Sequence, residues 1–147
     1  MPRILALDWG SRRIGVSISD ELKIFAQTPI SPLQNNNQVF KNLERLVIEY
    51  EIEKVLLGLP KSMSGEKNAS YEKVEDFGER LYEKLGLRAE FLDERLSTVE
   101  ARKSLQIQGL SARQQKDLID NRVAQLLLQQ YLDRNYKSDT NIEEINE

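Results

Sequence analysis

Acidic residues stand at three places where the sequence predicts the end of a strand or the start of a helix. Asp8 follows the apolar run RILAL and precedes a Trp-Gly pair, and Asp93 and Glu94 end the run RAEFLDE. Asp120 lies near the start of the last predicted helix, one turn before the small residue Ala124. Ligands of open α/β sheets bind beyond the carboxyl ends of the strands. If the first and last strands are neighbours in the parallel part of the sheet, these acids meet at one site.

Three carboxylates that converge with no basic residue among them repel each other, and a divalent cation removes that repulsion. Oxygen ligands without histidine or cysteine favour Mg²⁺ or Mn²⁺. Such a site suits phosphodiester hydrolysis, because metal ions can stabilise the attacking and leaving oxygens without a side-chain nucleophile. The predicted chemistry is that of a metal-dependent nuclease.

The chain has no histidine and no cysteine. A Ser-His-Asp triad, a Cys-His pair, histidine-based ribonuclease chemistry and a zinc site of thiolates or imidazoles are all excluded. A disulfide framework is excluded as well, which is compatible with a cytoplasmic protein. An enzyme of this composition must work with carboxylates, lysines, hydroxyls, backbone groups or a hard metal.

Each acid also has a purely structural interpretation. Asp8 could cap a turn, Glu94 could pair with Arg95 or Arg102, and Asp120 could be an ordinary charge in a first helical turn. Asp120 is the weakest of the candidates, because acids are common at that position. Asp8 is the strongest, because it ends a strand.

Several basic residues near these acids could contact a phosphate. We predict substrate contacts from Arg12 and Arg13, which follow the Trp-Gly turn, from Lys61 in a Gly/Ser-rich loop, and from Arg95 after the acidic strand end. For Arg12 and Arg13 the alternative is a salt bridge to Asp20 or to the sheet edge. Other polar residues have a weaker case as contacts and fit better as solvated loop, helix cap or helix face: Lys67, Ser97, Thr98, Arg102, Lys103, Arg113 and Lys116. Trp9 could stack on a base, although a core position is the more common one for tryptophan.

The elements that must position these residues alternate between strand and helix. Short turns join the first three strands, which predicts an antiparallel meander, and the later strands read as buried parallel strands joined by helices. The predicted strands are residues 3–9, 13–19, 24–30, 54–60 and 88–94, and the predicted helices are 39–50, 71–85 closed by Gly86, a helix opened by a capping box at 97–100 and interrupted by Gly109, and 116–131. We predict an α/β domain with a mixed five-stranded sheet flanked by helices.

The 147 residues fit one domain, predicted over 1–137, with a polar and disordered tail over 138–147. No stretch approaches the roughly 18 apolar residues of a membrane span, and the N-terminus does not read as a signal peptide. We therefore expect no membrane partner and a cytoplasmic location. The net charge of −3 argues mildly against nucleic acid as a partner, but the excess acids lie after Leu132 and the remainder is neutral.

The motifs DWGSRRIGVSISD, GLPKSMSG, DERLST and IDNRVAQLLLQQYLD, in this order, resemble the YqgF-type (RuvX) family. The resemblance covers about residues 3–133. Members of that family are described as pre-16S rRNA nucleases or Holliday junction resolvases and have a ribonuclease H-like fold. The resemblance implies the same fold for this chain. It also implies a nuclease acting on structured RNA, chiefly the 5′ end of pre-16S rRNA in ribosome biogenesis, or on branched DNA, with ribosomal particles as a further partner.

Asp8, Glu94 and Asp120 match the family's acidic positions, with Mg²⁺ or Mn²⁺ as the implied cofactor. Neighbouring side chains of a strand point to opposite faces, so only one of Asp93 and Glu94 should face the metal. Glu94 is the preferred ligand and Asp93 the second choice. Two departures bear on this match: Ser64 stands where Asn or Asp is common before glycine, and NRVA over 121–124 replaces the usual pair of alanines. The latter puts the packing around Asp120 in question.

Three other functions remain open at this point. A junction resolvase would use the same chemistry on DNA and would need a symmetric dimer, whereas composition allows a monomer or a weak dimer without disulfides. An actin-like or kinase-like ATPase would need two lobes, and this chain has room for one. A non-catalytic RNA-binding or assembly module would not need clustered carboxylates.

Overall fold

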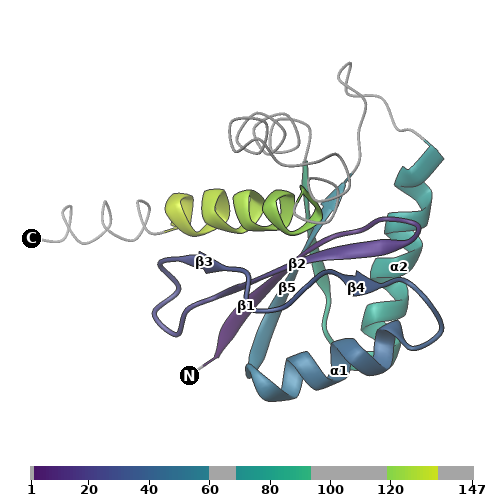
Figure 1. The fold of residues 1–147 in the computed structure, drawn as a ribbon, viewed down its shortest axis with the longest axis horizontal. Helices are drawn as coiled ribbons and strands as arrows, with labels where there is room; N and C mark the ends of the chain where they lie inside the picture. Colours follow the sequence, from purple (N-terminus) through teal and green to yellow (C-terminus); the bar gives the residue numbers. More distant parts are fainter. Residues whose placement is uncertain (1, 60–68, 94–118, 136–147) are drawn as a thin grey trace, which may run out of the picture.

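The computed structural model describes residues 2–59, 69–93 and 119–135. The elements in these ranges build a central sheet with helices on both of its faces (Figure 1). In chain order they are β1 (Arg3–Asp8), β2 (Arg13–Ser19), β3 (Ala26–Gln27), β4 (Leu33–Gln34), α1 (Val39–Glu49), β5 (Ile52–Leu59), α2 (Ala69–Leu85), β6 (Ala89–Asp93) and a helix over 119–135.

The sheet is mixed, as predicted. Its strand order is β3-β2-β1-β5-β6, and β4 adds a sixth strand that pairs with β2. β1 and β2 are antiparallel, whereas β1–β5 and β5–β6 are parallel. This meander continued by parallel strands confirms the predicted ribonuclease H-like α/β class. The single strand predicted over residues 24–30 is replaced by two short strands, because Pro29 and Pro32 cannot donate to a ladder and separate β3 from β4.

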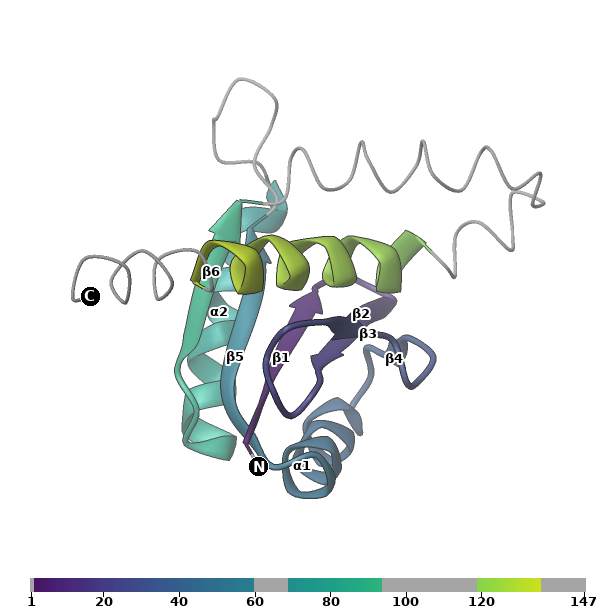
Figure 2. The same ribbon diagram turned by 90° about the vertical axis from the view of Figure 1, so that its left-hand side faces the viewer.

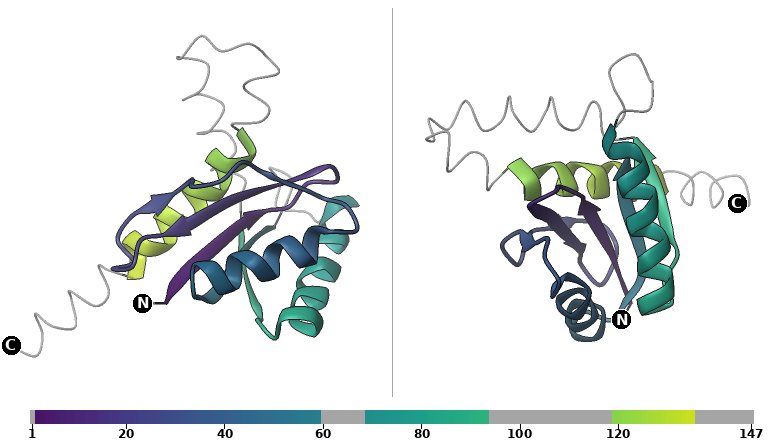
Figure 3. Two further views of the ribbon diagram at one scale, coloured as in Figure 1. Left: turned by 60° about the horizontal axis from the view of Figure 1, so that its bottom comes forward. Right: turned by 90° about the vertical axis from the view of Figure 1, so that its right-hand side faces the viewer.

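Alternation along the strands divides the core between the two faces of the sheet. Leu5 and Leu7 of β1 pack in a cluster with α1 and α2. Ile4 and Ala6 pack in a second cluster with Leu128 of helix 119–135. Figure 3 shows helix 119–135 on one side of the sheet and α1 and α2 on the other. We call these two sides the C-terminal helix face and the α1/α2 face.

The helices follow from apolar periodicity and a glycine stop. α1 buries Val39, Leu43 and Leu46 at i, i+4 and i+7, and α2 ends before Gly86. Gly86 has φ +72° and donates its N–H to the carbonyl of Tyr82 at 2.9 Å, which is a left-handed helix end that suits glycine. Both predicted helix positions are confirmed.

One prediction about the strands is wrong. The run that forms β6 is not a buried strand: only Ala89 and Leu92 are half-buried, and the other residues are exposed. β6 ends the sheet order on its side, so among the described residues no strand covers its outer edge. β6 therefore pairs with one strand, β5, rather than lying between two strands.

Helix 119–135 is anchored at its far end as well as near Asp120. Lys54 of β5 donates to the Tyr131 hydroxyl at 2.6 Å and forms a salt bridge with Glu90 of β6 at 3.1 Å. The hydrogen bond with Tyr131, opposed by burial and aided by Glu90, raises the pKa of Lys54.

Among the described helices, none combines the length and the apolar character of a membrane-spanning segment.

Candidate functional site

Asp8, the last residue of β1, lies on the C-terminal helix face. Ile4 and Ala6 face that side, so the alternation of the strand places Asp8 on it as well, and Trp9 on the α1/α2 face. The Asp8 side chain is half-buried, at the carboxyl end of the strand. This is the end at which α/β sheets bind their ligands.

Gly15 brings Asp120 beside Asp8. In the antiparallel β1–β2 ladder Asp8 is paired directly with Gly15, so the two residues face the same side of the sheet. A Cβ atom placed on Gly15 would collide with the backbone carbonyl of Asp120, and it would lie 3.0 Å from the backbone nitrogen of Asn121. Helix 119–135 therefore lies directly on Gly15. Figure 2 shows this helix running across the strands of the sheet. Asp8 and Asp120 therefore both lie next to Gly15, on the same face of the sheet.

A basic residue stands beside these acids, contrary to the expectation of a purely acidic cluster. Arg13 Nε lies 3.4 Å from Asp120 Oδ2, and their side chains are 24% and 26% exposed. Arg13 is two residues from Gly15 in β2, so alternation gives it the face that meets the helix. The predicted alternative of a salt bridge between Arg13 and Asp20 is wrong, because Arg13 pairs with Asp120 instead.

Asp20 closes the turn that follows β2 instead. Its Oδ1 accepts the backbone N–H groups of Ile24 and Phe25, each at 2.8 Å. Burial acts to raise the pKa of Asp20, but these backbone donors outweigh it and the pKa is lowered. The carboxylate is therefore engaged at the opposite end of β2 from Arg13.

A row of amide side chains, unnoticed in the sequence, fixes helix 119–135 to the edge of β2. Asn121 Oδ1 accepts the Val16 N–H at 2.8 Å, and Asn121 Nδ2 donates to the Ile30 carbonyl at 2.8 Å. One and two turns further on, Gln125 and Gln129 bond the backbone of residues 24–26. β3 and β4 pair with the two ends of β2, and Asn121 fills the gap between them. The spacing 121, 125, 129 was the available signal, since it puts three amides on one helical stripe.

Loss of the Asn121 amide should destabilise the protein strongly. Asn121 is buried, so the Asn121→Ala variant leaves the Val16 N–H and the Ile30 carbonyl without their partner, at a cost of about 2–3 kcal/mol in urea unfolding. Asn121→Asp keeps the acceptor for Val16 but loses the donor to Ile30. Its stability should therefore lie between that of Asn121→Ala and that of the wild type. Gln125→Ala, on the same stripe but only half-buried, is the matched control with a smaller loss. An Asn121→Ala variant as stable as the wild type would refute this role.

The turn between β1 and β2 is held tightly at the carboxyl end of β1. A Cβ on Gly10 would collide with the carbonyl oxygen of Arg13, which makes glycine necessary there. Asn35 donates its side-chain amide to the Gly10 carbonyl at 2.7 Å and its backbone N–H to the Arg12 carbonyl at 2.8 Å. The Arg12 side chain is exposed on this fixed turn, which is compatible with a substrate contact.

The second predicted ligand falls at the limit of the described residues. Phe91 of β6 packs against α2 at Gly78, whereas Leu92 packs on the C-terminal helix face. Alternation then places Asp93 with Phe91, away from Asp8. Consistent with this, no group of three acids suited to a metal occurs among the described residues. Glu94 lies outside them, as do Lys61, Arg95 and the weaker candidates Lys67, Ser97, Thr98, Arg102, Lys103, Arg113 and Lys116.

The neighbour of Asp8 on β5 is a glycine. Leu7 pairs with Leu57, so Gly58 follows as the neighbour of Asp8 on β5, and Gly58 pairs with Leu92 of β6. Gly58 carries no side chain, and none from β5 therefore stands between Asp8 and the last strand. The arrangement offers hard oxygen donors beside an arginine at the carboxyl end of β1.

Comparison with known proteins identifies the family of this chain. A family model described as "RuvX: Holliday junction resolvase" matches residues 2–134. The chain belongs to the RuvX family. A relative from Lactobacillus helveticus is 43% identical over 140 residues (92% of this chain and 99% of that protein), and one from Streptococcus sanguinis is 41% identical over 138 residues (91% and 99%). Both carry the name "Putative pre-16S rRNA nuclease".

More distant members of the RuvX family match over a similar length. A protein of the same name from Dictyoglomus thermophilum is 37% identical over 133 residues, which is 89% of this chain and 95% of that protein. Among solved structures, "T. thermophilus RuvC in complex with Holliday junction substrate" is similar with a TM-score of 0.48 and 9% identity, covering 84% of this chain and 92% of that one.

Proposed function

We propose that this chain is a divalent-metal-dependent nuclease that hydrolyses phosphodiester bonds of structured RNA, and that it processes the 5′ end of pre-16S rRNA. The observation that carries the proposal is the placement of Asp8 and Asp120 on either side of Gly15, at the carboxyl end of β1. Two carboxylates from distant parts of the chain share one face there. The names of the relatives, "Putative pre-16S rRNA nuclease", support pre-16S rRNA as the substrate.

The donor set fits a hard divalent cation. Asp8 and Asp120 provide carboxylate oxygens, the chain contains no histidine or cysteine, and Gly58, the neighbour of Asp8 on β5, has no side chain of its own. Oxygen-only ligands of this kind suit Mg²⁺ or Mn²⁺. We assign Glu94 as the further ligand, since Asp93 shares its face with Phe91. A bound divalent ion would supply a Lewis acid for the phosphate and a lower pKa for the attacking water.

The side chains around the acids would bind and orient the nucleic acid. Arg13, beside Asp120, and the exposed Arg12 can each donate to phosphate oxygens, and a guanidinium can do so with two hydrogen bonds. Lys61 and Arg95 are proposed as further phosphate contacts. Asn121 and the Gly15 contact keep Asp120 at a fixed distance from Asp8, which preserves the geometry that in-line hydrolysis needs.

Removing the charge of Arg13 should strengthen metal binding and weaken cleavage. A cation 3.4 Å from Asp120 opposes a second cation there. After allowance for partial exposure, the Arg13→Gln variant should bind Mn²⁺ roughly two- to fivefold more tightly, measured by titration calorimetry. RNA cleavage should fall, because a phosphate contact is lost. Arg12→Gln is the control from the same turn, and it should leave Mn²⁺ affinity unchanged. Weaker Mn²⁺ binding by Arg13→Gln would contradict this account.

A Holliday junction resolvase is the second candidate, and the description of the matching family model favours it. The chemistry would be the same, but cleavage of two strands needs a symmetric dimer. The experiment that separates the candidates incubates the protein with Mg²⁺ or Mn²⁺ and a labelled RNA that carries the 5′ flank of 16S rRNA. A four-way DNA junction is tested alongside it. Cleavage of the RNA supports the proposal, and cleavage of the junction alone overturns it in favour of recombination.

A further inference from the structure

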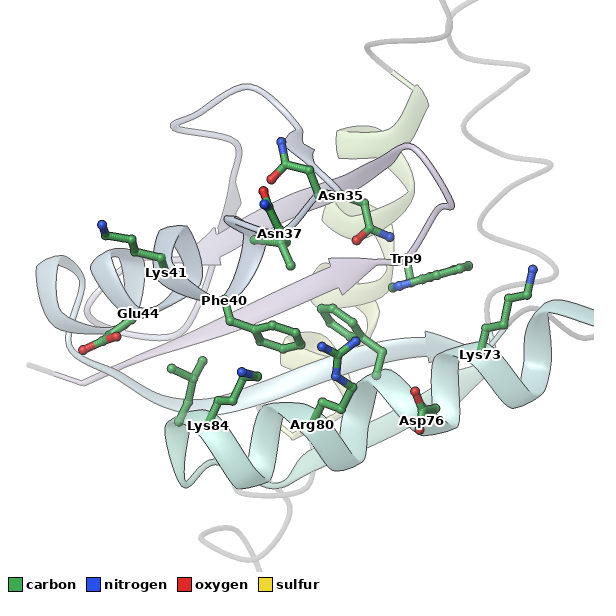
Figure 4. A pocket seen from close by; sticks show the side chains of 14 residues that line it. Trp9, Asn35, Asn37, Phe40, Lys41, Glu44, Lys73, Asp76, Arg80 and Lys84 are labelled. Carbon is green, nitrogen blue, oxygen red and sulfur yellow. The ribbon is translucent and has the colours of Figure 1, made fainter.

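A basic cleft opens on the α1/α2 face, on the opposite side of the sheet from Asp8. It lies between α1, α2 and the segment before α1, and its volume is about 660 Å³ (Figure 4). Four cations line it, Lys41 of α1 and Lys73, Arg80 and Lys84 of α2, against two acids, Glu44 and Asp76. The cleft therefore has an excess of positive charge in a chain whose net charge is −3.

The charge of α2 is sorted between its two sides. All three of its basic residues line the cleft, at positions 73, 80 and 84, which fall on one helical stripe. Of its five acids only Asp76 lines the cleft, and three others, Glu75, Glu79 and Glu83, line a hollow on the other side. The side of α2 that faces the cleft is therefore mainly basic, and the side that lines the other hollow is acidic.

Two of the four cations lie over a pair of stacked aromatic rings, and all four are available to a ligand. Phe40 and Phe77 are stacked with ring centroids 5.1 Å apart, and Arg80 and Lys84 lie 5.0 and 5.4 Å from the centre of the Phe40 ring. Within the described residues, none of the four cations forms a salt bridge with a carboxylate. Their charge is therefore not already neutralised by a neighbouring acid.

The cleft reaches the turn that carries the candidate catalytic acid. Trp9, half-buried and directly after Asp8, lines one end of the cleft, with Asn35 beside it. Figure 4 shows the Trp9 ring at the end of β1 with Lys73 across from it and Arg80 and Lys84 further along α2. From Lys73 to Lys84 the helix rises about 16 Å, which corresponds to a few nucleotides of a stacked strand rather than to one.

We propose that this cleft binds a single-stranded segment of the RNA substrate, with a base stacked on Trp9 and successive phosphates along Lys73, Arg80 and Lys84. The strand would pass around the carboxyl end of β1, from the Asp8 edge to the α1/α2 face. Stacking on aromatic rings combined with a line of cations is how proteins hold single strands without reading their sequence. This inference rests on the proposed nuclease function, because it identifies where the substrate extends beyond the acids.

The single tryptophan of the chain makes a site-specific test possible. Trp9 fluorescence of the full chain, as the Asp8→Asn variant in EDTA so that no cleavage occurs, is titrated with a ten-nucleotide oligouridylate and with uridine monophosphate. We expect saturable quenching by the oligomer and none by the mononucleotide at the same nucleotide concentration. Equal quenching by the mononucleotide would contradict the binding of a strand and indicate a pocket for a free nucleotide. No change in fluorescence with the oligomer would contradict binding at this cleft.

A matched pair of triple variants separates the cleft from overall charge. Lys73→Gln/Arg80→Gln/Lys84→Gln should weaken oligomer binding at least tenfold and lower the slope of log K against log salt by about 2, since each single-strand phosphate contact contributes about 0.7. The control is the variant Arg45→Gln/Arg88→Gln/Arg134→Gln, which removes three cations outside the cleft. It changes the net charge by the same amount and should keep the wild-type slope. Equal losses in the two variants would overturn the proposal.

Replacing the stacking ring gives an independent check. With a fluorescent label on the oligomer, the Trp9→Leu variant should bind about tenfold more weakly by anisotropy, and Trp9→Phe should recover most of that loss. Unchanged binding by Trp9→Leu would refute the stacking. Because all of these titrations measure binding alone, a protein that binds the oligomer normally but cleaves no RNA would contradict the nuclease function and leave the cleft intact.

Discussion

Replacement of Asp8 with asparagine should lower metal-dependent RNA cleavage by roughly 10³-fold without unfolding the protein. A metal centre contributes several kcal/mol to transition-state stabilisation, and about 1.4 kcal/mol corresponds to a factor of ten in rate. Asparagine has nearly the same shape as aspartate but lacks the charge that the cation requires. Since Asp8 is half-buried at a strand end and outside the hydrophobic clusters, the fold should not depend on its charge. Initial cleavage rates at saturating Mg²⁺ measure the effect.

The control for Asp8→Asn is Asp133→Asn, an exposed acid in the last turns of helix 119–135. Its Oδ1 accepts a hydrogen bond from Gln129 at 3.0 Å, which an asparagine can also accept. Asp133→Asn should therefore keep wild-type activity. Circular dichroism and thermal melts of both variants establish that they are folded. An Asp8→Asn protein that still cleaves within a few-fold of the wild type would mean that catalysis occurs elsewhere or that the activity belongs to a contaminant.

Replacement of Gly15 with alanine should have the second largest effect, on both stability and activity. The new methyl group would occupy the position of the Asp120 backbone carbonyl, and neither β2 nor helix 119–135 can move away without losing the Asn121 hydrogen bonds. Overpacking of this kind costs about 3 kcal/mol, which lowers Tm by roughly 6–12 °C in a domain of this size. A displacement of about 1 Å at Asp120 should reduce cleavage about 100-fold even at temperatures at which the variant is still folded.

Gly78→Ala is the matched control for Gly15→Ala. A Cβ at Gly78 would meet the Cζ atom of Phe91 at 2.8 Å, but that atom is the end of a side chain that is 39% exposed and free to turn outward. The same substitution should therefore shift Tm only slightly and leave the cleavage rate unchanged. If Gly15→Ala melts and cleaves like Gly78→Ala, the close approach of helix and strand has no role in placing Asp120.

Asp8 and the sheet around it were predictable from the sequence because the information is local. An apolar run that stops at an acid and a Trp-Gly pair predicts a strand end, and β1 ends at Asp8. Three strands with short connections predict a meander, and β1 and β2 are antiparallel. The exposure of β6 was not predictable in this way, because apolar residues alone do not reveal whether a strand has one neighbour or two.

The partners of Asp120 could not be predicted, because they depend on how a helix from the end of the chain crosses the first strands. Arg13 and Asp120 are 107 positions apart, and alternation cannot say which acid an arginine in β2 will meet. In the sequence, Asn121 differs from other polar helix residues only in that NRVA replaces the usual pair of alanines. In the structure it is the residue that bonds the edge of β2. Gly15 within an alternating strand was a usable signal, since glycine there often marks a close backbone approach.

Binding of Mn²⁺ in the absence of nucleic acid tests the central claim most directly, namely that Asp8 and Asp120 belong to one divalent-cation site. The free Mn²⁺ signal in electron paramagnetic resonance is followed as the wild-type protein, Asp8→Asn, Asp120→Asn and the control Asp133→Asn are added. We predict that the wild type and Asp133→Asn remove Mn²⁺ from solution, and that Asp8→Asn and Asp120→Asn each bind it at least tenfold more weakly. An Asp8→Asn protein that binds Mn²⁺ as tightly as the wild type would contradict the site.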